Sequence, residues 1–430
     1  MRVLILGGYG FVGAQLMAAL SQRGHDVCGA GRDIAFARRR YAFWDWAEVD
    51  FADPPAPPRW AEILNGVDAV INCVGVLQDG GRDSTRTAHI SGAESVFRAC
   101  EANGVRRFIQ ISAVGAEPDA PTEYARSKAE GDARLRETAL DWVILKPSLI
   151  IGRTGYGGTA LVRGLAGLPW ITPVSDPETR FRPVMIDDLA AAIDYFLAPS
   201  APSRMTLDIA GPEEKTLGEI IPLYQDWLGF PRTRLWRPPG ILSNLAFRAG
   251  DLLGRAGLRT PLRTTARHQM AYNVGGDAKA WTDRTGTKPQ TLREYFRLKP
   301  STVEDRWRAR LYFVKPFALL LFGLFWIASG LIALGPGANQ ARQLLLSAGV
   351  PFPLLALWMT AGLDILIGVG ILSGRWRRRA LIAAFGVSLI YFAGIMLAAP
   401  YLLVDALGAG LKTVLAPIAA LFLLAVDSER

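Results

Sequence analysis

The sequence predicts an α/β fold built on a doubly wound parallel sheet, followed by an all-α bundle that spans a membrane. Three observations predict it. A glycine-rich turn joins an apolar strand to a helix at the start of the chain. Further short apolar runs then alternate with segments of helical periodicity. Beyond residue 310, long apolar runs dominate, in a chain that is 50% hydrophobic overall.

Composition narrows the classes of partner. The net charge of +9 does not form a basic stripe interleaved with aromatic residues, so we do not expect nucleic-acid binding. The three cysteines and three histidines are scattered, and we expect neither a disulfide framework nor a metal site. The opening MRVLILGGYG has the pattern of a strand and turn rather than of a signal peptide. A basic chain with apolar segments favours an anionic membrane surface, so the lipid bilayer is the expected partner.

The first predicted strand, RVLIL, leads into GGYGFVG and then into the helical spacing of AQLMAAL. The glycines of the turn form G-x-x-G-x-x-G. Glycine lets the backbone turn tightly and approach a pyrophosphate, whose charge the helix N-terminus attracts. The sequence therefore predicts a dinucleotide site here. Its predicted cofactor-binding residues are Gly7, Gly10, Phe11, Val12 and Gly13.

The second strand, within HDVCGAGRD, selects the cofactor. An NAD site usually places an acidic residue at this strand end to bind the ribose 2′-hydroxyl. Here small residues occupy that zone and Arg32 follows. An arginine there favours a 2′-phosphate, so NADP(H) is the preferred cofactor and NAD(H) the alternative. From the third strand end, VDFAD, we expect Asp50 near the adenine, and from DAVINCVGV we expect Gly75 beside the cofactor.

The segment YARSK carries the predicted chemistry. Tyr124 and Lys128 are four residues apart and share a helix face, toward the strand RRFIQISAVGA that carries Ser112. A free phenol has a pKa near 10, and a nearby ammonium lowers it. A serine hydroxyl can hold the substrate oxygen. Ser112, Tyr124 and Lys128 are therefore the predicted catalytic residues for hydride transfer at a carbonyl, unless the Tyr/Lys pair only clamps the cofactor.

Residues 1 to about 300 resemble the short-chain dehydrogenase/reductase superfamily in its extended and atypical branches. The motifs that carry this resemblance are GGYGFVG, ISAVGA, YARSKAEGDARLRET, WVILKPSLIIGR and FRPVMIDDLAAAI. The resemblance implies a Rossmann-type fold with Tyr124 as acid/base. It also implies that Lys128 binds the nicotinamide ribose and that Ser112 orients the substrate. Pro147, with Ser148 after it, is implied to line the nicotinamide pocket.

Within that superfamily, the chain is similar to the NADPH-binding accessory subunit of respiratory complex I. This similarity implies nucleotide binding without turnover, and a respiratory or other membrane complex as partner. Many extended members place an asparagine on the helix before the serine strand, where it helps to relay protons. In RTAHISGAESVF, His89 or Ser91 falls near that position, and we leave both outside the predicted catalytic set.

We predict three regions: an NADP(H)-binding domain at 1–205, a substrate-binding lid and linker at 206–305, and a membrane domain at 306–430. The lid contains an apolar stripe at helical spacing, surrounded by arginines. Such a helix either lies in a membrane interface or packs its stripe on the core, and the sequence leaves both open. The stripe comprises Leu242, Leu245, Ala249, Leu252 and Ala256.

The last region predicts four membrane spans, each with about 20 mostly apolar residues. They are expected at 312–334, 353–373, 380–400 and 407–426. Lys and Arg cluster before the first span and in SGRWRRR, which places both termini and that loop in the cytoplasm of a multi-pass inner-membrane protein. These spans resemble the DoxX-like family, on the four-helix pattern and GLDILIGVGILSGRWRRRA.

Asp364 lies in the middle of the second predicted span. An ionisable residue at that depth is a functional hypothesis. Lys412 is one candidate partner, although its side chain tends to reach toward the outer surface. A protonated or water-bonded aspartate inside the bundle is the alternative.

Together these observations predict a membrane-anchored NAD(P)H-dependent oxidoreductase that acts on a carbonyl or quinone-like lipophilic substrate. The first alternative is a non-catalytic NADPH-binding assembly or sensor module on a membrane scaffold. The second is a nucleotide-sugar epimerase or dehydratase, against which Arg32 and the missing acidic residue of the second strand argue.

Overall fold

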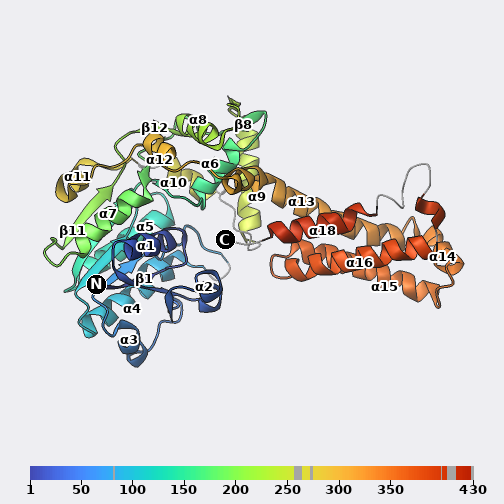
Figure 1. Cartoon of the computed structure of the whole chain (residues 1–430), viewed down its shortest axis with the longest axis horizontal. Coiled ribbons are helices and arrows are strands. Elements are labelled where there is room, and N and C mark those ends of the chain that lie inside the picture. The colour runs from blue at the N-terminus through green and yellow to red at the C-terminus, as the bar shows by residue number, and fades with distance from the viewer. Residues whose placement is uncertain (81–82, 256–263, 272–274, 399, 404–412, 428–430) are drawn as a thin grey trace. The chain divides into compact units, whose positions relative to one another are not determined.

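The computed structural model describes residues 1–80, 83–255, 264–271, 275–398, 400–403 and 413–427. The chain divides into two compact units, Met1–Ala309 and Arg310–Arg430. The first contains the large sheet and the second is helical (Figure 1). A separate lid that begins at residue 206 stays a prediction.

The large sheet of the first unit has seven parallel strands in the order β11-β6-β5-β4-β1-β2-β3. They are β1 Arg2–Leu6, β2 Asp26–Gly31, β3 Asp45–Glu48, β4 Ala69–Asn72, β5 Arg107–Ile111, β6 Asp141–Pro147 and β11 Met205–Ile209. The strand order reverses between β1 and β4, which confirms the doubly wound sheet and marks its ligand crevice. The third strand lies earlier than expected: Asp50 is in a turn, where its Oδ1 accepts the amide of Ala52 at 3.0 Å.

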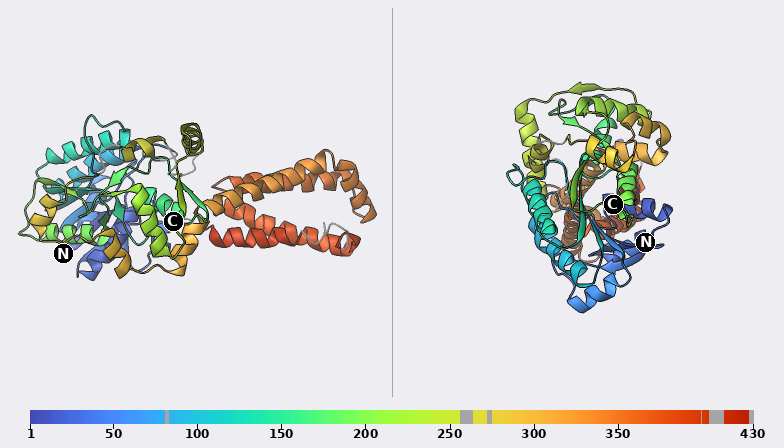
Figure 2. Two further views of the ribbon diagram at one scale, coloured as in Figure 1. Left: turned by 90° about the horizontal axis from the view of Figure 1, so that it is seen from above. Right: turned by 90° about the vertical axis from the view of Figure 1, so that its left-hand side faces the viewer.

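Helices cover both faces of this sheet (Figure 2). Val3 and Ile5 of β1 join the core beneath α1 (Phe11–Gln22) and α7 (Ile186–Leu197). Leu4, with the alternate residues of the other strands, packs against the opposite helices, and the strands read as continuous apolar runs because both faces are buried. Those opposite helices are α3 Pro57–Leu64, α4 Gly92–Ala102 and α5 Glu123–Arg136.

Short elements complete the first unit, including three two-stranded sheets that pair β10 with β7, β12 with β9 and β13 with β8. Trp281 anchors α11 beside the large sheet, because its buried indole donates to the carbonyl of Ala210 at 3.0 Å. The remaining elements are α2 Ile34–Arg40, the π-helical turn η1 Thr87–Ser91, β7 Ile150–Ile151, α6 Gly158–Ala166, β8 Ile171–Pro173, β9 Arg180–Phe181, β10 Val184–Met185, β12 Lys215–Thr216, α8 Leu217–Leu228, β13 Arg234–Trp236, α9 Gly240–Arg255, α10 Thr264–Ala271, α11 Lys279–Thr285 and α12 Leu292–Leu298.

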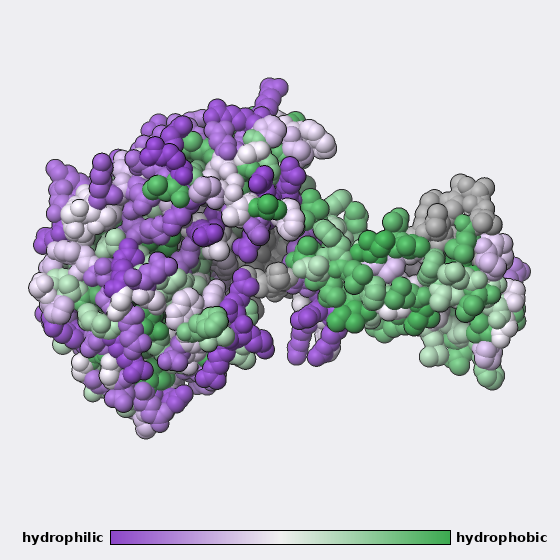
Figure 3. Space-filling model, in the orientation of Figure 1, coloured by the Kyte–Doolittle hydropathy of each residue, from purple (hydrophilic) through white to green (hydrophobic). Residues whose placement is uncertain are grey.

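The second unit is built from apolar helices, and its surface is mostly hydrophobic (Figure 3). Among the described residues, α13, α15 and α16 are each long and apolar enough to cross a membrane. The shorter α18 is described from residue 415, and part of the predicted span 407–426 lies outside the described residues. The elements are α13 Val303–Leu334, α14 Ala338–Ser347, α15 Pro353–Leu372, α16 Arg377–Ala398, η2 Pro400–Leu403 and α18 Leu415–Val426.

Two features hold these helices together. Glycines let α13 and α15 approach closely: a Cβ on Gly368 would clash with the backbone of Gly323. Lys315 and Arg377 each lie 3.5 Å from the carboxylate of Asp427. Lys315 of α13, the start of α16 and the end of α18 therefore lie close together in this unit, as a bundle of alternating helices requires.

Candidate functional site

The glycine turn lies at the carboxyl end of β1, beside the reversal of strand order. Gly7 has a φ of 71°, and a Cβ on Gly13 would clash with its carbonyl oxygen. A Cβ on Gly7 would lie 3.2 Å from the backbone that follows β4. Helix α1 begins at Phe11 with neither a side-chain cap nor an acidic residue in its first turn. Its free N–H groups and positive helix end fit the pyrophosphate of a dinucleotide.

Arg32 follows the end of β2, where the second ribose of a dinucleotide lies in this fold. Its Nη2 donates to Oδ1 of Asp83 at 2.6 Å. The next acidic residue, Asp33, is engaged too, because its carboxylate caps α2 by accepting the amide of Phe36 at 2.9 Å. A bound 2′-phosphate would therefore accept hydrogen bonds from the same guanidinium group that donates to Asp83.

Helix α5 positions YARSK at the carboxyl end of β5. The Thr122 side chain caps the helix by accepting the amide of Ala125. Lys128 is buried, and its Nζ donates to the carbonyl of Ile111 at 2.8 Å. The same Nζ would lie 3.4 Å from a Cβ on Gly75. The structure thus brings the predicted residues Lys128 and Gly75 together, at adjoining strand ends.

Tyr124 lies one turn before Lys128 and is half-buried. Its ring meets the edge of the His89 ring, with the ring centroids 5.5 Å apart. Burial, with the carboxylate of Asp132, raises the pKa of Tyr124 to about 12. The expected net lowering of the Tyr124 pKa is therefore wrong for this arrangement, because burial of the phenol raises this pKa.

His89, rather than Ser91, reaches the site, because Ser91 is exposed and His89 is buried. The amide of Val76 donates to Nε2 of His89 at 3.1 Å. Nδ1 therefore carries the proton and donates to Oγ of Ser127 at 2.8 Å. Burial, followed by the charge of Lys128, holds the pKa of His89 well below its usual value. The imidazole is a neutral support for Tyr124.

Ser112 is hydrogen-bonded to the carboxylate of Asp132, a residue that the sequence did not predict for the site. Its Oγ donates to Oδ2 of Asp132 at 2.6 Å, and the two residues are 4% and 1% exposed. Oδ1 of Asp132 has no hydrogen-bond partner among the described residues. Burial raises the pKa of Asp132, whereas the Ser112 hydroxyl and Lys128 lower it. While its proton is committed to Asp132, Ser112 can accept a hydrogen bond from an alcohol; it can donate one to a carbonyl only when that oxygen displaces Asp132.

The remaining predicted residues lie at the same edge of the sheet or near it. Pro147 ends β6, and its carbonyl accepts the amide of Val114 at 3.1 Å. Phe11 stacks on Tyr156 of the loop before α6, with ring centroids 6.4 Å apart. Among the described residues, no group of three His, Cys, Asp or Glu side chains could hold a metal ion.

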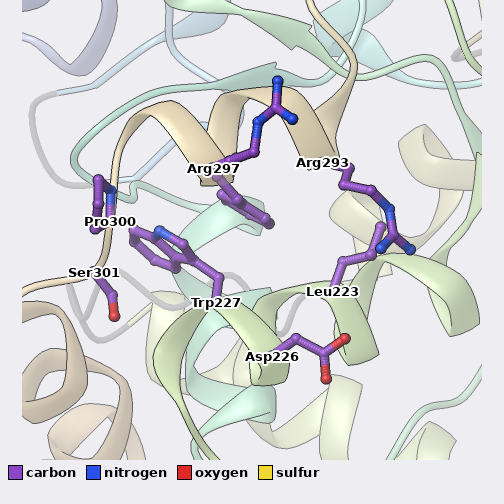
Figure 4. Close-up of a pocket in the computed structure, with 8 residues that line it drawn as sticks. Leu223, Asp226, Trp227, Arg293, Arg297, Pro300 and Ser301 are labelled. Carbon is purple, nitrogen blue, oxygen red and sulfur yellow. The ribbon is translucent and has the colours of Figure 1, made fainter.

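A shallow pocket of about 420 Å³ lies elsewhere, between α8 and α12 (Figure 4). Trp227 stacks on Phe296 at 4.9 Å, and Asp226 is held by Arg232 through two hydrogen bonds. None of the predicted site residues lines this pocket. We therefore place the candidate site by the glycine turn and α5, where the geometry fits a dinucleotide.

A second polar cluster lies inside the helical unit. Asp364 of α15 is 4% exposed. It accepts hydrogen bonds from Oγ of Ser329 on α13 at 2.9 Å and from the hydroxyl of Tyr391 on α16 at 2.8 Å. The predicted partner Lys412 lies outside the described residues. Sequence spacing could not find Ser329 or Tyr391, because they come from different helices.

Comparison with known proteins matches two regions separately. Residues 7–164 match the NAD(P)H-binding family, and residues 323–423 match the DoxX-like family. The NADH-ubiquinone oxidoreductase 40 kDa subunit of Neurospora crassa is 24% identical over 326 residues, which cover 72% of this chain and 84% of that protein. The 2-alkyl-3-oxoalkanoate reductase of Stenotrophomonas maltophilia is 31% identical over 228 residues, 46% of this chain and 65% of that protein.

Two further comparisons concern a lipid-directed relative and the fold. The ceramide reductase of Caulobacter vibrioides is 26% identical over 246 residues, 56% of this chain and 75% of that protein. The UDP-glucose 4-epimerase structure from Thermotoga maritima has a TM-score of 0.50 at 17% identity, covering 69% of this chain and 97% of that one. It shows the fold alone. The chain therefore joins an NAD(P)-binding domain of Rossmann fold, similar to short-chain dehydrogenases/reductases and epimerases, to a C-terminal DoxX-like domain.

Proposed function

We propose that this protein is a membrane-anchored, NADP(H)-dependent oxidoreductase that reduces a lipophilic carbonyl or quinone. The observation that carries the proposal is the position of Lys128 beside Gly75 at the carboxyl ends of β4 and β5, with Tyr124 one turn earlier on α5. This edge lies beside the glycine turn, at the reversal of strand order where ligands bind in such sheets.

Each residue then has a chemical role. A bound reduced nicotinamide supplies the hydride. Lys128 would hold the cofactor ribose, and the Tyr124 phenol would donate the proton to the substrate oxygen. A pKa of about 12 keeps the phenol protonated at neutral pH, which suits the direction of reduction. Ser112 would orient the substrate oxygen once that oxygen competes with Asp132 for the hydroxyl.

The substrate class rests on two supports. The 2-alkyl-3-oxoalkanoate reductase and the ceramide reductase are named for substrates that are an alkyl-substituted oxoalkanoate and a ceramide. The DoxX-like domain and three apolar helices would hold the site at a bilayer, where such substrates concentrate. We place both termini in the cytoplasm at the inner membrane, since Lys and Arg flank α13 and α16 at their starts.

Arg32 supports the preference for NADP(H). It lies at the β2 end and can meet a 2′-phosphate, and the nearby carboxylate of Asp33 already accepts the amide of Phe36 as the cap of α2. This also argues against a nucleotide-sugar epimerase with NAD. Arg32→Ala should weaken NADPH binding about tenfold and leave NADH binding unchanged.

The test uses the full chain in detergent, titrated with NADPH and NADH by nicotinamide fluorescence. Stopped-flow absorbance then follows cofactor oxidation with a panel of quinones and long-chain aldehydes. Tyr124→Phe should keep NADPH binding and lose about 100-fold or more in turnover, because only the proton donor is removed. Equal oxidation by both proteins would remove Tyr124 from the mechanism.

A second candidate is a non-catalytic NADPH-binding module of a membrane complex. The observation that favours it is the Ser112–Asp132 hydrogen bond. Ser112 donates its hydroxyl proton to Asp132 in this bond, so that proton is not directed at a substrate oxygen. Its 40 kDa mitochondrial relative is named as a subunit of a respiratory complex. Tight NADPH binding without oxidation by any acceptor, in wild type and Tyr124→Phe alike, would support this function instead.

A further inference from the structure

The outward face of α9 is apolar. Among the side chains of α9 that the structure describes, the buried ones are Ser243 and Phe247, one turn apart. Ile241, Leu242 and Leu245 are 83%, 50% and 64% exposed. The apolar stripe predicted for this helix therefore faces outward at its start, and does not pack on the core of the first unit. Packing against the protein core, the usual reason for an apolar stripe on a helix, therefore does not explain this one.

The rest of the predicted stripe extends along the same helix. Ala249 is exposed as well. The side chain of Leu252, and all of Ala256, lie outside the described residues.

The neighbouring sheet of β8 and β13 extends this apolar face. Trp170, Ile171 and Trp236 are 83%, 51% and 44% exposed. In the parallel register, Trp236 pairs with Pro173 at the end of β8. Two residues later, Oγ of Ser175 donates to Oγ of Ser243 on α9 at 3.2 Å. The sheet and α9 are thus neighbours, and we name their exposed apolar side chains the lid apolar surface: Trp170, Ile171, Trp236, Ile241, Leu242 and Leu245.

Positive charge borders this surface. Arg234 and Arg237 are exposed on β13 and directly after it, and Arg248 is exposed on α9. The nearby acidic residue Asp176 is engaged by Arg267, whose Nε lies 3.2 Å from its carboxylate. Tryptophan and leucine side chains bordered by arginines are the composition of segments that lie in the interface of an anionic bilayer.

We propose that the lid apolar surface binds the anionic headgroup and upper acyl region of the membrane in which the helical unit resides. Indole rings are favoured at that depth, and the arginines match the negative leaflet. The first unit is tethered to the bilayer, because the helical unit that begins at Arg310 belongs to the same chain. This contact is independent of turnover, and it would present the substrate lid directly to lipids.

The experiment measures lipid contact in the full chain. Leu245→Cys, in a variant without the three native cysteines, is labelled with an environment-sensitive fluorophore and reconstituted in nanodiscs containing brominated lipid. Arg98→Cys on α4, whose side chain is 79% exposed, is the matched control. We expect about threefold more quenching at Leu245 than at Arg98, and a further increase when phosphatidylglycerol joins phosphatidylcholine. Equal quenching at both positions, or quenching that ignores phosphatidylglycerol, would overturn the proposal.

A second variant separates lipid contact from folding. Trp236→Asp with Leu242→Asp changes only exposed positions, so NADPH binding should be retained. Quenching of the Leu245 probe should then fall to the level of the Arg98 control. Unchanged quenching in this variant would show that the surface does not hold the lid on the lipid.

Discussion

Two buried carboxylates, one in each unit, are held in different ways. Asp132 accepts one hydroxyl, that of Ser112 at 2.6 Å, and lies one helical turn after the buried cation Lys128. Asp364 accepts two hydroxyls, from Ser329 and Tyr391, and no Lys or Arg forms an ion pair with it among the described residues. The first cluster faces the nucleotide crevice, and the second joins three apolar helices.

The difference shows what each cluster can do. A cation beside a buried carboxylate compensates its charge and leaves one oxygen, Oδ1 of Asp132, without a hydrogen bond. Two hydroxyls satisfy both oxygens of Asp364 but supply no charge. We therefore expect the Asp132 cluster to be sensitive to charge changes and the Asp364 cluster to be sensitive to loss of hydrogen bonds.

The largest effect should come from Lys128→Met. It removes the ammonium beside Gly75 and leaves Asp132 as a buried charge without its cation. We expect NADPH oxidation to fall about 100-fold or more. Stability should fall by about 3 kcal/mol, because the remaining buried charge is uncompensated. Stopped-flow kinetics and urea unfolding of the full chain in detergent measure the two effects.

The matched control is the double variant Lys128→Met with Asp132→Asn. The amide keeps an acceptor for Ser112 and carries no charge, so most of the lost stability should return while activity stays low. If the double variant is no more stable than Lys128→Met alone, the two charges are not coupled. The contrast with Asp364 would then lose its electrostatic basis.

The pH profile gives the next largest effect. Since the pKa of Tyr124 is raised to about 12, the phenol is protonated throughout the neutral range. Reduction, which uses the protonated form, should be independent of pH between about 6 and 10. Oxidation of an alcohol by NADP⁺ uses the phenolate and should rise about tenfold per pH unit over that range. A bell-shaped profile centred near neutral pH would mean that Lys128 lowers this pKa in the working enzyme.

Ser127→Ala should have a smaller effect on the first cluster. It removes the acceptor of the buried Nδ1–H of His89, the neighbour of Tyr124. An unpaired buried donor costs about 1–3 kcal/mol, and turnover should fall only a few-fold because Tyr124 and Lys128 remain. Ser127→Thr keeps the hydroxyl and should behave as wild type. A loss of turnover as large as that of Tyr124→Phe would make His89 part of the proton transfer itself.

Sequence reasoning reached the elements of this site more fully than its contacts. The glycine turn and the Tyr124–Lys128 spacing are local, so one strand–turn–helix and one helix face predict them. Asp132 continues that face at the same spacing and could have been found. Its bond to Ser112 could not, because it depends on how α5 packs on β5. Similarly, Asp364 is evident from its depth in an apolar run, whereas Ser329 and Tyr391 depend on the packing of three helices.

The smallest effect should come from Asp364→Leu in the helical unit. The change strands the hydroxyls of Ser329 and Tyr391, and hydrogen bonds between membrane helices are worth about 0.6–2 kcal/mol each. Asp364→Asn keeps an acceptor and should cost less than about 1 kcal/mol. Thr360→Val is the control, since among the described residues that hydroxyl donates to carbonyls of its own helix. Unfolding in mixed micelles, followed by circular dichroism, ranks the three variants.

A different ranking would change the interpretation of this cluster. If Asp364→Asn costs as much as Asp364→Leu, the carboxylate itself is required and a cation must reach it. Lys412, on the segment before α18, is then the first residue to test by reversing both charges. If the expected ranking holds and NADPH oxidation is unchanged in all three variants, Asp364 joins the helices through hydrogen bonds, and the chemistry rests on the cluster around Tyr124 alone.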